Sequence, residues 1–128
     1  MNGPREHALG LLEKAAHDLI AAQATLDTGR ALDTVCFHAQ QAAEKSLKAA
    51  LATRDVVFPR THDLAELVVL ARPYCPALAE MANALASLSP YAVQVRYESA
   101  MDPGLEEARQ ALETAKRVHA LVEQFAKA

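Results

Sequence analysis

A row of polar side chains follows one face of the segment 31–54, whose other residues are mostly apolar. A helix turns by about 100° per residue, so four of these side chains share a strip about 80° wide: His38, Gln41, Lys45 and Lys48. Glu44 lies beside this strip and Gln40 lies on its far flank. Two ammonium groups, an imidazole and an amide in one row suit contacts with a phosphate or with a polar partner. The alternative is a solvated face with a Glu–Lys network, which is the commoner role of charged runs.

A second group of candidates precedes the last expected helix. Arg96 can pair with a phosphate in a bidentate way, and Tyr97 or Tyr91 can stack on a base. The two lysines of the strip would add positive charge. In the structural alternative, the tyrosines cover the end of the helical bundle, where their hydroxyls find partners, and Arg96 pairs with Glu44 or Glu98. The sequence leaves both interpretations open.

His62 stands directly before Asp63, at the expected start of a short helix. As a ligand-binding residue it would lie near a helix N-terminus, where anions bind readily. As a structural residue, the role we favour, it would cap the loop or pack on Tyr91. The remaining histidines lie on separate helices without a partner at metal-binding spacing: His7, His17 and His119. We therefore predict no metal site and no cofactor.

These candidates are positioned by helices. Apolar residues at steps of three and four predict three long helices, at about 5–27, 31–54 and 105–125. Two shorter helices are predicted at about 63–71 and 76–88, the first capped by Asp63 and the second opened by Pro76. The many alanines between 39 and 50 would let neighbouring helices approach closely, so 31–54 is the expected central helix. The predicted fold is all-α, an up-and-down antiparallel bundle of about five helices, three long and two short.

Composition narrows the class of protein. The chain has 128 residues, of which 52% are hydrophobic, and this size fits a single domain spanning 1–128. The formal net charge of −3 argues against a protein that coats nucleic acid through bulk charge. Cys36 and Cys75 form no CxxC pair, so we expect two free thiols in a reducing compartment. Neither a secretory signal nor a membrane-spanning apolar run is visible, which predicts a cytoplasmic protein without a membrane partner.

Three short motifs carry a resemblance to a known family. They are FHAQQAAEKSLKA at 37–49, THDL at 61–64 and RY at 96–97. In this order and spacing the chain resembles the HEPN domain over about residues 8 to 125. The resemblance implies a helical bundle that often dimerises and that, in prokaryotes, is frequently encoded beside a minimal nucleotidyltransferase, in some cases as a toxin–antitoxin pair. The residues expected to bind a nucleotide or RNA are Lys45, Lys48, His62, Arg96 and Tyr97.

Many HEPN domains are metal-independent ribonucleases that use an arginine followed four to six residues later by a histidine. This sequence departs from that motif, since Arg30 and Arg54 each precede a histidine by eight positions. It also departs at Glu98, where the family commonly has a proline after Arg-Tyr. A metal-free ribonuclease needs a base and a cation held together at the scissile phosphate. We therefore predict no catalytic residue, and the sequence favours a protein that is not an enzyme.

Three functions remain for comparison. The first is a nucleotide-binding or partner-binding module that works with a nucleotidyltransferase. The second is a diverged ribonuclease in which Arg96 and a histidine, His38 or His62, converge in space. The third is a purely structural protein whose alanine-rich helix pairs with a partner or with a second copy. The first is the function that we predict from the sequence.

Overall fold

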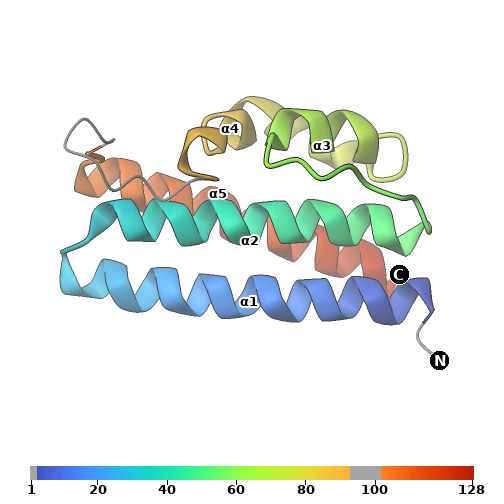
Figure 1. Cartoon of the computed structure of the whole chain (residues 1–128), viewed down its shortest axis with the longest axis horizontal. Helices are drawn as coiled ribbons and strands as arrows, with labels where there is room; N and C mark the ends of the chain where they lie inside the picture. Colours follow the sequence, from blue (N-terminus) through green and yellow to red (C-terminus); the bar gives the residue numbers. More distant parts are fainter. Residues whose placement is uncertain (1–2, 93–101) are drawn as a thin grey trace.

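The computed structural model describes residues 3–92 and 102–128, and within these ranges it contains five α-helices, two 3-10 helices and no strand (Figure 1). The long helices are α1 (Pro4–Thr28), α2 (Leu32–Thr53) and α5 (Leu105–Lys127). The short helices α3 (Leu64–Ala71) and α4 (Ala82–Ala86) are joined through η1 (Pro76–Met81), and η2 (Ser89–Ala92) follows α4. The all-helical class predicted from the sequence is confirmed.

α2 and α5 run in the same direction, and α1 runs opposite to both (Figure 1). α1 and α2 lie side by side and antiparallel, and α5 packs against both of them (Figure 1). α3 and α4 form a short return layer on the side of α2 that faces away from α1 (Figure 1). α2 is therefore surrounded by α1, α5, α3 and η2, all of which contact it. This arrangement is the predicted up-and-down bundle.

α2 is the central helix, as its alanines predict. Thirteen of its 22 residues are buried. Small side chains shorten the distance at which two helix axes can pack, and this helix meets its neighbours through fully buried alanines: Ala39, Ala42, Ala43, Ala49 and Ala50. Larger side chains fill the space between the helices, among them Leu47 and Leu51 on α2 and Val118 and Val122 on α5. Because α2 is enclosed on nearly every side, polar residues on it are buried too.

Helix ends follow the predicted signals. Gly29 ends α1 in the left-handed conformation, with a φ of 72°. Asp63 caps α3, and its carboxylate accepts the backbone N–H groups of Ala65 and Glu66. At the start of α5, Glu107 accepts the N–H of Gly104 at 3.2 Å, the reciprocal half of a capping box.

The predicted single helix at 76–88 is wrong in detail. Pro76 does open it, but the segment begins as the 3-10 helix η1 and becomes α-helical only at Ala82. A 3-10 helix aligns residues three apart, and Leu78 and Met81 have this spacing and are both buried. The spacing of apolar residues at 78, 81, 85 and 88 fits both helix types, so it does not separate them.

Candidate functional site

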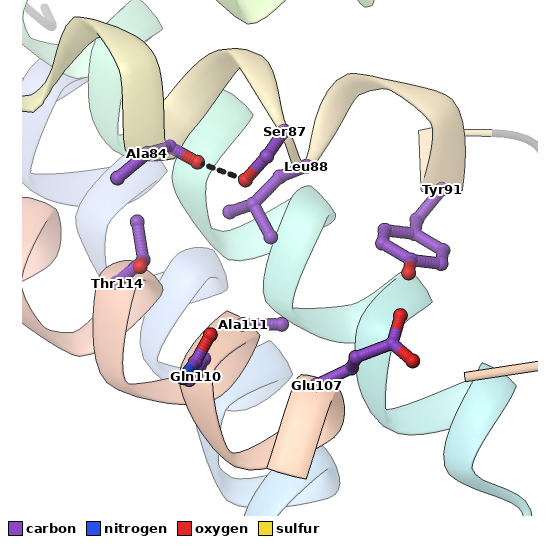
Figure 2. A pocket seen from close by; sticks show the side chains of 8 residues that line it. All are labelled: Ala84, Ser87, Leu88, Tyr91, Glu107, Gln110, Ala111 and Thr114. Carbon is purple, nitrogen blue, oxygen red and sulfur yellow. Dashed lines mark hydrogen bonds between the residues drawn. The ribbon is translucent and has the colours of Figure 1, made fainter. Parts of the chain in front are cut away.

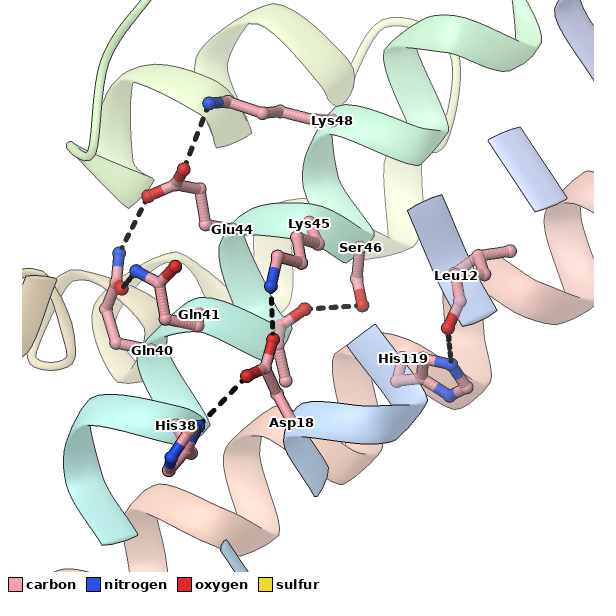
Figure 3. Close-up of polar contacts among 11 residues, drawn as sticks. Leu12, Asp18, His38, Gln40, Gln41, Glu44, Lys45, Ser46, Lys48 and His119 are labelled. Carbon is pink, nitrogen blue, oxygen red and sulfur yellow. Dashed lines mark hydrogen bonds and ion pairs between the residues drawn. The ribbon is translucent and has the colours of Figure 1, made fainter. Parts of the chain in front are cut away.

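Glu44 lies at the centre of a polar group on α2, although only 7% of the residue is exposed. Lys48 donates to one carboxylate oxygen at 3.0 Å, and Gln40 donates to the other at 3.1 Å (Figure 3). That second oxygen also lies 2.8 Å from Nδ1 of His62, in the loop before α3. We call these four residues the Glu44 cluster. It joins α2 to the start of α3 through hydrogen bonds and an ion pair.

The Glu44 cluster favours an ionised carboxylate. Burial opposes ionisation, but hydrogen bonds from His62, Gln40 and Lys48, together with the positive charge of Lys48, outweigh that effect. The net result is a pKa of Glu44 below its usual value of 4.5. At neutral pH the cluster therefore holds a buried negative charge next to Lys48, whose side chain is 16% exposed.

A second carboxylate, Asp18 of α1, contacts two other residues of the polar strip, Lys45 and His38. Its Oδ2 lies 2.6 Å from Nζ of Lys45, and its Oδ1 lies 3.0 Å from Nδ1 of His38 (Figure 3). The Asp18 side chain is 12% exposed, so this pairing is largely withdrawn from solvent. We call these three residues the Asp18 cluster. It fastens α1 to α2.

The Asp18 cluster leads to a prediction about stability. Replacing Asp18 by alanine leaves Lys45 and His38 without their shared acceptor, so the free energy of unfolding should fall by about 2 kcal/mol, the usual cost of losing charged hydrogen bonds in a partly buried site. Urea denaturation monitored by circular dichroism measures it. Asp27→Ala is the matched control, because Asp27 is an exposed carboxylate of the same helix that accepts from Gln23, a neighbour on that helix. Equal losses in both variants would contradict the clamping role.

The structure divides the predicted strip between two partners. His38 and Lys45 contact Asp18. Lys48 contacts Glu44 instead. Gln41 donates to the side-chain oxygen of Gln40 at 2.6 Å. Lys48 also lies over the ring of Phe58, with 5.6 Å from Nζ to the centroid. The strip is thus a set of paired, half-buried groups rather than a solvated face.

The predicted nucleotide-binding residues divide in the same way. Lys48 and His62 both contact Glu44, so the structure brings these two together. Lys45 belongs instead to the Asp18 cluster. His62 contacts Glu44 through one ring nitrogen, and 64% of its side chain remains exposed. Arg96 and Tyr97 lie outside the described residues.

Two important residues were missed or misjudged in the sequence. Asp18 was not singled out, although it interrupts the apolar stripe of α1 between Ala15 and Ala22, and a carboxylate in such a stripe signals a buried partner. Gln40 was placed on the far flank of the strip, yet it is fully buried and donates to Glu44 and to the carbonyl of His62, at 3.1 and 3.4 Å.

The fold and its buried polar centre on α2 define a small helical-bundle domain. The HEPN domain family matches residues 8–125, and the chain therefore belongs to the HEPN family. The crystal structure of TT1696 from Thermus thermophilus is 31% identical, with a TM-score of 0.80 over 93% of this chain and 98% of that one. ST0689, an archaeal HEPN homologue, is 21% identical with a TM-score of 0.76 and covers 98% of this chain and 99% of its own, which supports the fold alone. No curated protein is significantly similar to the chain.

The described residues lack two further kinds of feature. In residues 3–92 and 102–128, no helix has the length and apolar character that crossing a membrane requires. Within the same ranges, no three His, Cys, Asp or Glu side chains gather closely enough to hold a metal ion.

Proposed function

We propose that this HEPN domain is a nucleotide-binding module and that the Glu44 cluster is part of its phosphate-binding surface. The observation that carries the proposal is the pairing of Lys48 and His62 on one carboxylate. Lys48 balances the charge of Glu44, and His62 lies against the same carboxylate, so the cluster presents an ammonium group and an imidazole ring on one surface. Because Nδ1 of His62 faces Glu44 at 2.8 Å, Nε2 is the ring nitrogen available to a ligand. Imidazolium and ammonium groups are effective donors to phosphate oxygens.

The position of η2 supports including the next segment of chain in this surface. The hydroxyl of Ser89, in η2, accepts the backbone N–H of Leu64 at 2.9 Å. This contact holds η2 at the start of α3, next to His62 in sequence. Arg96 and Tyr97 follow η2 by a few residues, and in the proposed function they supply a bidentate phosphate contact and a stacking surface for the base. Lys45 adds positive charge from the neighbouring Asp18 cluster.

Calorimetric titration with ATP and the other ribonucleotides tests this function. We expect saturable binding that weakens by about tenfold in His62→Gln, because one charge-assisted contact to phosphate is lost. Lys14→Gln is the control, since Lys14 is an exposed lysine on α1 outside both clusters.

The result has two informative outcomes. If the affinity is unchanged in His62→Gln, or falls equally in Lys14→Gln, the ligand does not bind at the Glu44 cluster. Absence of binding heat with every nucleotide would remove the nucleotide-binding function itself.

The biological setting belongs to the same proposal. We propose that the domain acts in the cytoplasm as a homodimer, together with a minimal nucleotidyltransferase in a two-component system of the toxin–antitoxin kind. Membership of the HEPN family supports this partnership. Sedimentation of the isolated chain tests self-association directly, and a monomer at high concentration would contradict the dimer.

A further inference from the structure

A cleft of about 330 Å³ lies between the return layer and α5, apart from both polar clusters (Figure 2). Leu88, which is 2% exposed, and Ala111, which is 5% exposed, form its apolar base. Tyr91 of η2 and Glu107 of α5 point toward one another at one end (Figure 2). The remaining walls come from Ala84, Ser87, Gln110 and Thr114. A volume of this size stands at the lower end of the range for small-molecule sites.

The cleft carries negative charge. The described residues that line it include Glu107 but no Lys, Arg or His. The N-terminus of α5 contributes about half a positive charge, and two carboxylates in its first turn, Glu106 and Glu107, more than offset it. Burial, with a contribution from Glu107, raises the pKa of Tyr91, and burial raises the pKa of the neighbouring Cys36 to about 11. Tyr91 and Cys36 are therefore uncharged at neutral pH, and Glu107 is the one carboxylate among the described residues of the lining.

The polar groups of the lining offer mainly hydrogen-bond acceptors. One oxygen of Glu107 accepts the N–H of Gly104, and among residues 3–92 and 102–128 no hydrogen bond to the other oxygen is seen. The amide nitrogen of Gln110 donates to Glu106 at 3.4 Å, and within the described part of the chain its oxygen accepts no hydrogen bond. The hydroxyl of Ser87, the residue after α4, donates to the backbone carbonyl of Ala84 at 2.6 Å and keeps its lone pairs. A ligand that matches this set must itself bring donors.

We propose that this cleft binds a small organic cation, a primary amine or a guanidinium compound, between the carboxylate of Glu107 and the ring of Tyr91. The carboxylate accepts charge-assisted hydrogen bonds from the cation. The face of an aromatic ring attracts a cation placed over it, and the apolar base accommodates the carbon chain. The site is independent of the proposed nucleotide surface, because the charge of Glu107 repels a phosphate.

Three compounds with the same carbon chain separate charge from shape: putrescine, butanediol and succinate. Each is titrated into the isotope-labelled protein while the backbone amide resonances are followed by NMR. We expect saturable shifts at Tyr91, Glu107 and Gln110 with putrescine, and none with the neutral diol or the anion. Added salt should weaken the binding, since the contact is electrostatic and partly exposed.

Three variants test the role of Glu107 and of the cleft. Glu107→Gln keeps an acceptor for the N–H of Gly104, and putrescine binding should weaken by about tenfold as the ion pair is lost. Glu113→Gln removes an exposed carboxylate of the same helix outside the cleft and should leave the affinity within about twofold. Ala84→Leu should block the cleft without changing its charge. Failure of putrescine to bind, equal binding of the diol, or unchanged affinity in Glu107→Gln would each overturn the proposal.

Discussion

Replacing Glu44 by alanine is expected to lower the free energy of unfolding by about 3 kcal/mol, the usual effect of removing one partner of a buried ion pair. Lys48 would lose its carboxylate in a site where its side chain is only 16% exposed. Gln40, which is fully buried, would lose the closer of the two acceptors of its amide group and keep only the carbonyl of His62 at 3.4 Å. Urea denaturation at neutral pH measures the loss. Glu13→Ala is the control, because Glu13 is an exposed carboxylate on α1, and its expected change is within about 0.5 kcal/mol.

The pH dependence of the free energy of unfolding, compared between the protein and Glu44→Gln, checks the role of the Glu44 charge independently. The pKa of Glu44 in the folded protein lies below its usual value of 4.5, so the carboxylate stabilises the fold fully above pH 4.5 and loses this contribution as the pH falls through its folded pKa. The difference in stability between the protein and Glu44→Gln should therefore shrink below pH 4.5. A difference that stays constant from neutral pH to about pH 3 would show that the charge of Glu44 does not stabilise the fold.

Leu47→Ala is the second change with a large expected effect. Leu47 is fully buried on the central helix, and Ala43 and Ala50 on the same side of α2 are buried too, so truncating Leu47 leaves a cavity in the core. Truncations of this kind cost about 2 to 5 kcal/mol, depending on how far the cavity collapses. Thermal and urea unfolding both report the loss.

Ile20→Ala serves as the matched control for Leu47. Ile20 is a large apolar residue on α1 that is 67% exposed, so its truncation should change stability by less than about 0.5 kcal/mol. Similar losses at positions 20 and 47 would mean that α2 is not the enclosed centre of the bundle.

The helices could be predicted closely because their signals are local. The first predicted segment, 5–27, compares with Pro4–Thr28, and the second, 31–54, compares with Leu32–Thr53. Asp63 and Gly29 mark helix ends through the hydrogen bonds or backbone conformation that their own residue types favour. The 3-10 start at Pro76 was not predicted, because over so short a segment both helix types bury the same apolar residues.

The polar site could be predicted only in part. The sequence placed Lys45 and Lys48 on one face of α2, and both lie there. They pair with different carboxylates, Lys45 with Asp18 and Lys48 with Glu44. The partner of Lys45 is Asp18, 27 residues earlier in the chain. The partner of His62 is Glu44, 18 residues earlier. Helical periodicity describes angles within one helix and contains no information on which neighbouring helix faces each side chain.

The sequence by itself determined the three long helices, the central position of α2 and the family, because apolar period, alanine content and short motifs are properties of the chain read in order. Only the tertiary structure decided which polar side chains pair, because enclosing α2 on nearly every side buries Gln40 and Glu44. A buried polar group must find a hydrogen-bond partner within reach. How the helices pack in space decides the partners from other elements: His62, before α3, for Gln40 and Glu44, and Asp18 of α1 for Lys45.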